Sequence, residues 1–212
     1  MNTSVPPPLS GRRAEAARND RRILEAARHV FIADPEAPIS AVAERAGVGI
    51  SALYRRYRSK DDLLRRLSGD GLAVYIAEVE RALVSDADVW SAFAEFMRRV
   101  VEADTHALTL RLAGAFTPTN DLYEESARAS ELTRRLLDRA KAERAIRSDI
   151  EVTDLSLLFE QLSAVRVRDQ ARTRQLRHRN LALVLAALHL VDAPPLPGTA
   201  PSWDEFSERW DT

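Results

Sequence analysis

Two short apolar patterns on either side of a glycine constrain this chain more than any other feature of its sequence. Apolar residues recur at i, i+3, i+4 and i+7 over residues 39–46, and a second pattern with helical spacing covers residues 50–57. Gly47 lies between them, where a helix needs a left-handed stop. A longer amphipathic pattern precedes both and ends at Asp34-Pro35, because the residue before proline disfavours α-helix. Three such helices predict a helix-turn-helix, whose second short helix fits the major groove of DNA.

The rest of the chain also predicts helices, so the expected fold class is all-α. Only 7 of 212 residues are glycine, aromatic residues make up 6%, and no segment alternates with the period of a strand. A Pro-rich N-terminal segment predicts a disordered tail, and a second Pro-rich segment predicts a linker before a short closing helix. We expect a tail over 1–11, the three-helix unit over 12–67, a helical bundle over 68–192, and a linker with the closing helix over 193–212. Within the bundle we expect helices over about 60–84, 86–104, 105–116, 120–146, 153–171 and 181–191, with a basic turn or helix end over 166–179.

Charge is distributed unevenly along the chain. Residues 12–67 hold 13 Lys or Arg against 8 Asp or Glu, a balance of +5, whereas residues 68–212 hold 18 against 24. A basic helix-turn-helix beside an acidic bundle predicts an anionic partner for the first part, although ordinary fluctuation of surface charge explains the same balance.

The segments Val42-Ala-Glu-Arg-Ala-Gly-Val48 and Ala52-Leu-Tyr-Arg-Arg-Tyr57, followed by Ser59-Lys60 and Leu63-Leu64, carry a family pattern. Residues 21–65 resemble the DNA-binding domain of tetracycline-repressor (TetR) type regulators. The resemblance implies a ligand-responsive transcriptional regulator that binds a palindromic double-stranded DNA operator as a homodimer. It favours repression, with release by a small-molecule effector. It also implies that the bundle is a ligand-binding and dimerisation domain.

The resemblance implies specific contacts to DNA. Arg55 is the best candidate for a bidentate contact to guanine, with a phosphate contact or a solvated charge as the alternative. Lys60, one of only two lysines, falls at a helix N-terminus where a phosphate is favoured. Gly49 replaces the usual Ser and Arg56 the usual His of the family, and Pro38 stands near the usual Thr or Ser. The full set of implied DNA-binding residues is Ser40, Gly49, Ile50, Ser51, Tyr54, Arg55, Arg56 and Lys60; for Ser40 a solvent-facing role is equally open, and Tyr54 has half-buried packing as its alternative.

The apolar surface of the bundle exceeds what one pair of helices can hide, so a ligand cavity or a dimer interface is expected. The candidate ligand-binding residues are Phe93, Phe96, Met97, His106, Phe116, Tyr123 and Phe159, for most of which ordinary core packing is the alternative. We expect the homodimer to form through helices at about 153–171 and 178–192, by way of Leu155, Leu158, Leu162, Leu181, Leu185 and Leu188.

Other functional classes are disfavoured. The chain has no Cys, no His-Glu-x-x-His, no phosphate-binding glycine loop and no nucleophile elbow, so we expect no enzyme, no cofactor and no metal site. No apolar run reaches the about 20 residues of a membrane span, and no signal peptide is evident, which predicts a cytoplasmic protein. The remaining alternative is a helical protein–protein adaptor without DNA binding, which would not need the basic short helix with Lys60 in register.

Overall fold

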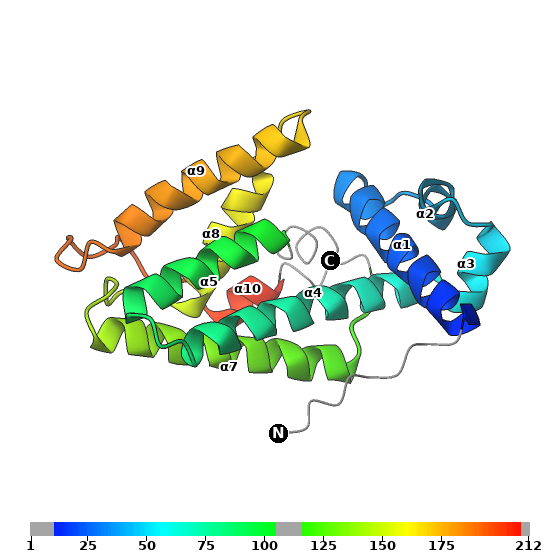
Figure 1. Ribbon diagram of the computed structural model, residues 1–212. Coiled ribbons are helices and arrows are strands. Elements are labelled where there is room, and N and C mark those ends of the chain that lie inside the picture. Colours follow the sequence, from blue (N-terminus) through cyan, green and yellow to red (C-terminus); the bar gives the residue numbers. More distant parts are fainter. Residues whose placement is uncertain (1–10, 105–115, 209–212) are drawn as a thin grey trace, which may run out of the picture. The chain divides into compact units, whose positions relative to one another are not determined.

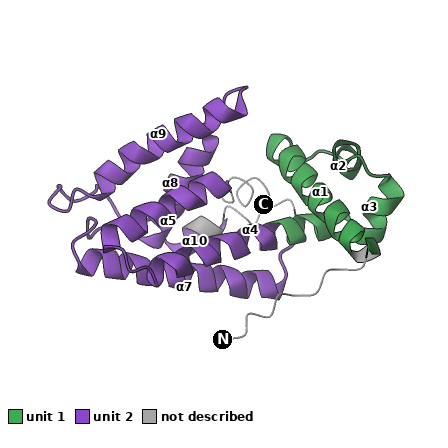
Figure 2. Ribbon diagram, viewed as in Figure 1, with its two compact units in different colours: residues 1–67 green, residues 68–212 purple. Residues whose placement is uncertain are grey.

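The computed structural model describes residues 11–104 and 116–208, and in these ranges all regular secondary structure is helical (Figure 1). The chain divides into two compact units, Met1–Leu67 and Ser68–Thr212 (Figure 2). The first unit contains the helix-turn-helix and the second contains a helical bundle, which confirms the expected all-α fold class. No helix in the described part of the chain is both long enough and apolar enough to span a bilayer.

The first unit consists of α1 (Gly11–Ala33), α2 (Ile39–Ala46), α3 (Ile50–Arg56) and the start of α4 (Lys60–Leu83). Helix α1 begins at Gly11, and the other residues of the expected tail lie outside the described ranges. The three helices pack through a small apolar core to which each contributes, because their apolar stripes face one another. Its fully buried members include Ala27, Phe31, Val42 and Leu53.

Gly47 makes the turn between α2 and α3. Its backbone is left-handed (φ 63°), and its N–H donates to Glu44 O at 3.0 Å while the N–H of Val48 donates to Ala43 O at 3.0 Å. A side chain at this position would be strained by the positive φ, and the end of the flexible Arg22 side chain would have to move, because its Nη2 would lie 2.9 Å from the added Cβ. The left-handed backbone is therefore the main reason for a glycine at this turn.

The sequence Ser59-Lys-Asp-Asp62 is that of a capping box, and the structure differs from this motif in one bond. Ser59 Oγ accepts from the N–H of Asp62 at 3.1 Å, as in the motif. The carboxylate of Asp62 accepts from the N–H of Arg58 at 3.2 Å, one residue before the serine. The start of α4 is therefore held on both sides, which fixes Lys60 at its first position.

The second unit contains the rest of α4 and the helices that follow it. The expected helix over 105–116 lies outside the described residues except for Phe116. Helix α7 ends four residues before the expected Ile146, and Arg144 beyond it has a left-handed backbone (φ 52°). The elements are α5 (Val89–Ala103), α7 (Asn120–Ala142), α8 (Val152–Ala164), α9 (Gln170–Leu188) and α10 (Trp203–Ser207).

The expected division between a basic turn and a separate apolar helix near residue 180 is wrong. Helix α8 ends at Ala164, and α9 begins at Gln170 and continues without a break to Leu188. Asp169 caps α9 by accepting from the N–H of Arg172 at 2.5 Å. The basic segment thus forms the first turns of the same helix that carries the apolar run.

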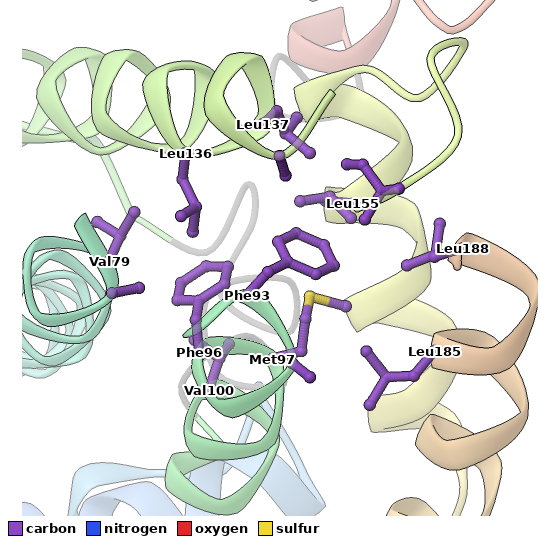
Figure 3. Packing of buried hydrophobic residues seen from close by; sticks show 14 of the residues in the cluster. Val79, Phe93, Phe96, Met97, Val100, Leu136, Leu137, Leu155, Leu185 and Leu188 are labelled. Carbon is purple, nitrogen blue, oxygen red and sulfur yellow. The ribbon is translucent and has the colours of Figure 1, made fainter. Parts of the chain in front are cut away.

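The core of the bundle is formed by side chains from α4, α5, α7, α8 and α9, which point toward one another (Figure 3). Tyr75, Phe96 and Phe159 form an aromatic cluster with centroid distances of 5.6, 6.3 and 6.2 Å and near-perpendicular rings. Thr133 donates its hydroxyl to Ala129 O at 2.7 Å, so the hydroxyl of Tyr75, 2.9 Å away, donates to Thr133 Oγ1. The hydroxyl of Tyr75 therefore has a hydrogen-bond partner within the bundle.

Candidate DNA-binding surface and ligand-binding bundle

Helix α3 has one buried side and one exposed side. Leu53 is fully buried against α1 and α2, whereas Ile50, Ser51, Tyr54 and Arg55 are exposed. Tyr54 is 48% exposed, so about half of the residue stays accessible to a binding partner although the other half is packed. Among the described residues, Arg55 has no ion pair. The four side chains therefore form one accessible face with hydrogen-bonding and apolar groups, as reading of base edges requires.

The other residues expected to contact DNA come shortly before and after this face along the chain. Gly49 caps α3 with an extended backbone and supplies no side-chain bond, and Ser40 is exposed in the first turn of α2. Lys60, the first residue of α4, is partly buried, and its Nζ lies 5.4 Å from the ring centroid of Phe31. The ring restricts the ammonium group to the N-terminal end of α4, where backbone amides also favour an anion.

Arg56 has a partner that the sequence did not indicate. Its Nε and Nη2 donate to the two carboxylate oxygens of Asp20 on α1, at 2.6 and 3.0 Å. The hydroxyl of Tyr57 donates to the same carboxylate at 2.7 Å. The hydrogen bond from Arg56 lowers the pKa of Asp20, and burial together with the bond to Asp20 raises the pKa of Tyr57. No short-range pattern could have predicted this contact, because the partners are 36 and 37 residues apart.

The expected ligand-binding residues separate into three groups. Phe93, Phe96, Met97 and Phe159 belong to the same core cluster, where each is at most 1% exposed. Phe116 is partly buried, and His106 lies outside the described residues.

Tyr123 forms the third group alone, because it lies away from the core. Its side chain is 61% exposed and lines a surface hollow of about 340 Å³, together with Trp203 and the outer face of α7. The structure therefore brings four of the seven side chains together and places Tyr123 elsewhere.

The leucines expected at a dimer interface are part of the core of their own chain. Leu155, Leu162, Leu181, Leu185 and Leu188 are all buried. Leu158 is partly buried against the same core. The reason is that α9 packs on α5 and α8, which takes up this stripe (Figure 1). The expected interface is wrong in these residues, and the exposed apolar side of α9 is a different one, with Leu183 67% exposed. Leu190, two residues beyond the end of α9, is 60% exposed.

The described ranges contain no group of three or more His, Asp or Glu side chains arranged to hold a metal ion. Arg177 on α9, almost fully buried, forms an ion pair with Asp104, the C-cap residue of α5, at 2.7 Å.

The chain matches known proteins in both units. Residues 23–67 match the family of bacterial regulatory proteins of the tetR type, and residues 88–190 match the C-terminal domain of SbtR-like transcriptional regulators. Over 86 residues the chain is 38% identical to the HTH-type transcriptional repressor LfrR of Mycolicibacterium smegmatis. That match covers 41% of this chain and 43% of the repressor, so it spans less than half the length of that relative.

Solved structures with the same fold include two regulators. The TetR transcriptional regulator SCO0520 from Streptomyces coelicolor is 27% identical, with a TM-score of 0.56 over 80% of this chain and 98% of that one. LfrR from Mycobacterium smegmatis in complex with proflavine is 23% identical, with a TM-score of 0.56 over 78% of this chain and 95% of that one. With the family matches covering the helix-turn-helix and most of the bundle, the chain belongs to the TetR family of bacterial regulatory proteins.

Proposed function

We propose that this chain is a transcriptional repressor that binds a palindromic DNA operator as a homodimer and is released by a small-molecule effector. The exposed face of α3 carries the proposal, because Ile50, Ser51, Tyr54 and Arg55 point outward while Leu53 anchors the helix. Helix α2 braces α3 from behind, as a reading helix in the major groove requires. The partial match to the repressor LfrR supports repression as the direction of control.

Within this proposal the residues divide into two kinds of contact. Arg55, exposed near the end of α3, reads guanine in the major groove and supplies specificity. Lys60 and Ser40 contact phosphates and fix the register without reading sequence. Tyr54 adds a phosphate contact through its hydroxyl.

A homodimer follows from the demands of recognition, since one seven-residue helix makes too few base contacts to select a site in a genome. The described surface offers an apolar stripe for this purpose along α9 and just beyond its end. It contains Ala182, Leu183 and Ala186 of the helix and Leu190 two residues after it, which are all exposed. Association through this stripe would hide leucine side chains that the isolated chain leaves in water.

Release by an effector requires that the effector bind one form of the dimer more tightly than the other, and that the preferred form have the lower affinity for DNA. A 100-fold loss of DNA affinity corresponds to about 2.7 kcal/mol of coupling. Phe93, Phe96, Met97 and Phe159 already touch one another or their core neighbours, so a ligand among them selects a form in which the bundle has opened. Their apolar and aromatic character favours a hydrophobic or aromatic effector.

The decisive experiment recovers the DNA that the protein binds across the genome and tests the recovered site in a gel-shift assay. Binding of a two-fold symmetric site by two chains is the expected result. Proflavine, the compound in the LfrR crystal structure, is the first probe for release. A protein that recovers no DNA above background, at low salt, would contradict the proposal.

A further inference from the structure

The carboxylate of Asp20 joins α1 to the end of α3 through three hydrogen bonds. Arg56 is the last residue of α3 and Tyr57 is its C-cap, and both donate to Asp20 at 2.6 to 3.0 Å. The Asp20 side chain is only 17% exposed, although that of Arg56 is 55% exposed. A carboxylate that accepts a two-bond guanidinium contact and a phenol in this way is held in one orientation.

Helix α3 has few other means of holding its direction. It has seven residues, Gly49 gives it no side-chain cap, and Leu53 is its single buried residue. A helix of this length does not persist on its own in water, so its contacts to other elements decide where it lies. Leu53 fixes the middle of the helix, and the contacts of Arg56 and Tyr57 fix its end. Without the bond to Asp20, α3 could turn about Leu53.

We propose that Asp20 is a positioning residue for operator recognition: it holds the reading helix at its C-terminal end and keeps Arg56 from serving as a phosphate contact. This inference rests on the proposed function in its DNA-binding part. It gives Arg56 a different role from the backbone contact expected from its place in the sequence. The pair is neutral as a whole, so the cations left for DNA near α3 include Arg55, Arg58 and Lys60 but not Arg56.

The two roles of Arg56 differ in what salt does to DNA binding. A phosphate contact releases counterions, so its loss reduces the slope of log affinity against log salt by about 1. An internal partner of Asp20 leaves that slope unchanged, but its loss lets α3 move and so weakens the preference for operator over other DNA.

The test measures binding of the recovered operator and of a scrambled duplex of equal length over a range of salt concentrations. For Arg56→Met and Asp20→Ala we expect the operator preference to fall about tenfold. Arg56→Met should keep the wild-type salt slope on scrambled DNA, whereas Lys60→Ala should reduce it by about 1. Glu25→Gln is the matched control, because it removes one exposed carboxylate from α1 and should leave the preference unchanged.

A reduced slope in Arg56→Met with an unchanged operator preference would overturn the proposal, since Arg56 would then be a phosphate contact. Hydrogen exchange on the DNA-free protein tests the same contact separately. Asp20→Ala and Arg56→Met should each speed exchange of the α3 amides about tenfold, and the double variant should add little, because both remove one interaction. Unchanged exchange in α3 would refute the contact as a restraint. Failure of the wild-type protein to bind any duplex would instead count against the proposed function, while exchange would still decide whether Asp20 holds α3.

Discussion

Arg177 on α9 forms an enclosed ion pair with Asp104, the residue that ends α5, with 2.7 Å between Nη1 and Oδ1. The same guanidinium donates through Nε to Val165 O at 3.1 Å and through Nη2 to Ser163 O at 2.9 Å. These carbonyls belong to the end of α8, where helical partners are lacking. One side chain of α9 therefore satisfies carbonyls at the end of α8 and pairs with the side chain that caps α5, which ties both helix ends to α9.

We expect Arg177→Met to lower the free energy of unfolding by about 3 kcal/mol or more, because it leaves a partly buried carboxylate and two carbonyls without their donor. Urea unfolding followed by circular dichroism measures the effect. The control is Arg179→Met, an exposed position two residues further along the same helix, which should stay within about 0.5 kcal/mol of wild type. Equal effects of both substitutions would show that the ion pair does not hold the helix ends.

The two lysines of the chain offer a matched test of the DNA-binding surface. Lys60 lies at the start of α4 beside the reading helix, and Lys141 pairs with Glu151 at 3.1 Å in the bundle. Lys60→Ala should weaken binding of operator and scrambled DNA by a similar factor, since a phosphate contact carries no sequence information. Lys141→Ala should change neither affinity. Fluorescence anisotropy with labelled duplexes distinguishes the two, and a similar loss in both variants would point to a general effect of charge.

The exposed stripe of α9 predicts where dimerisation can be broken. Leu183→Glu and Leu190→Glu should each shift the protein toward monomer at micromolar concentration, because a buried unpaired carboxylate in an interface is costly. Leu196→Glu is the control, since Leu196 is also exposed but lies eight residues beyond the end of α9, whereas Leu190 lies only two residues beyond it. Light scattering gives the mass in solution. A dimer that survives both the Leu183 and the Leu190 substitution would place the interface elsewhere.

The helix-turn-helix could be predicted from sequence because each of its signals is local. Apolar spacing defines α2 and α3, and glycine is the residue that best suits the left-handed turn at Gly47. The resemblance also placed Ile50, Ser51, Tyr54 and Arg55 on one exposed face. The partner of Arg56 was missed because its carboxylate comes from another helix, 36 residues earlier.

The bundle was harder to predict because one of its helices, α9, contains both a basic segment and an apolar segment, which look like separate elements in the sequence. Arg177 falls in the buried stripe of α9, and its charge made the segment look like a basic turn. Asp104 neutralises that charge from α5, which no periodicity along α9 could reveal. The same limit explains the wrong dimer residues, since a leucine stripe does not show whether its partner is the same chain or another one.

Gly69 in α4 predicts a substitution that stabilises the protein. A Cβ added there would lie 3.6 Å from Cδ2 of Leu122, an ordinary van der Waals contact, and its backbone is helical. Alanine in a helix is favoured over glycine by about 0.5–1 kcal/mol, so Gly69→Ala should raise the free energy of unfolding by that amount. Gly47→Ala is the contrasting variant and should destabilise, because its positive φ strains a residue with a side chain and the guanidinium of Arg22 would also have to move. A loss of stability in Gly69→Ala, measured by urea unfolding, would mean that α4 needs the glycine for another reason.

Tyr75 predicts a specific loss of stability at alkaline pH. Burial raises its pKa to about 12, whereas an exposed tyrosine ionises near pH 10. The unfolded chain therefore loses this proton first, so the contribution of Tyr75 to folding is complete below about pH 10 and disappears as the pH rises toward 12. Tyr75→Phe cannot ionise, and its free energy of unfolding should fall less steeply over that range than that of the wild type.

At neutral pH the same substitution should cost only about 1 kcal/mol, because Thr133 loses one hydrogen bond but still donates to Ala129 O. Urea unfolding of both proteins at several pH values separates the two effects. The offset at neutral pH reports the hydrogen bond, and the difference in slope above about pH 10 reports the ionisation. Parallel curves for the two proteins throughout the alkaline range would contradict the raised pKa. They would mean that the phenolate of Tyr75 is tolerated in the folded bundle as well as in the unfolded chain.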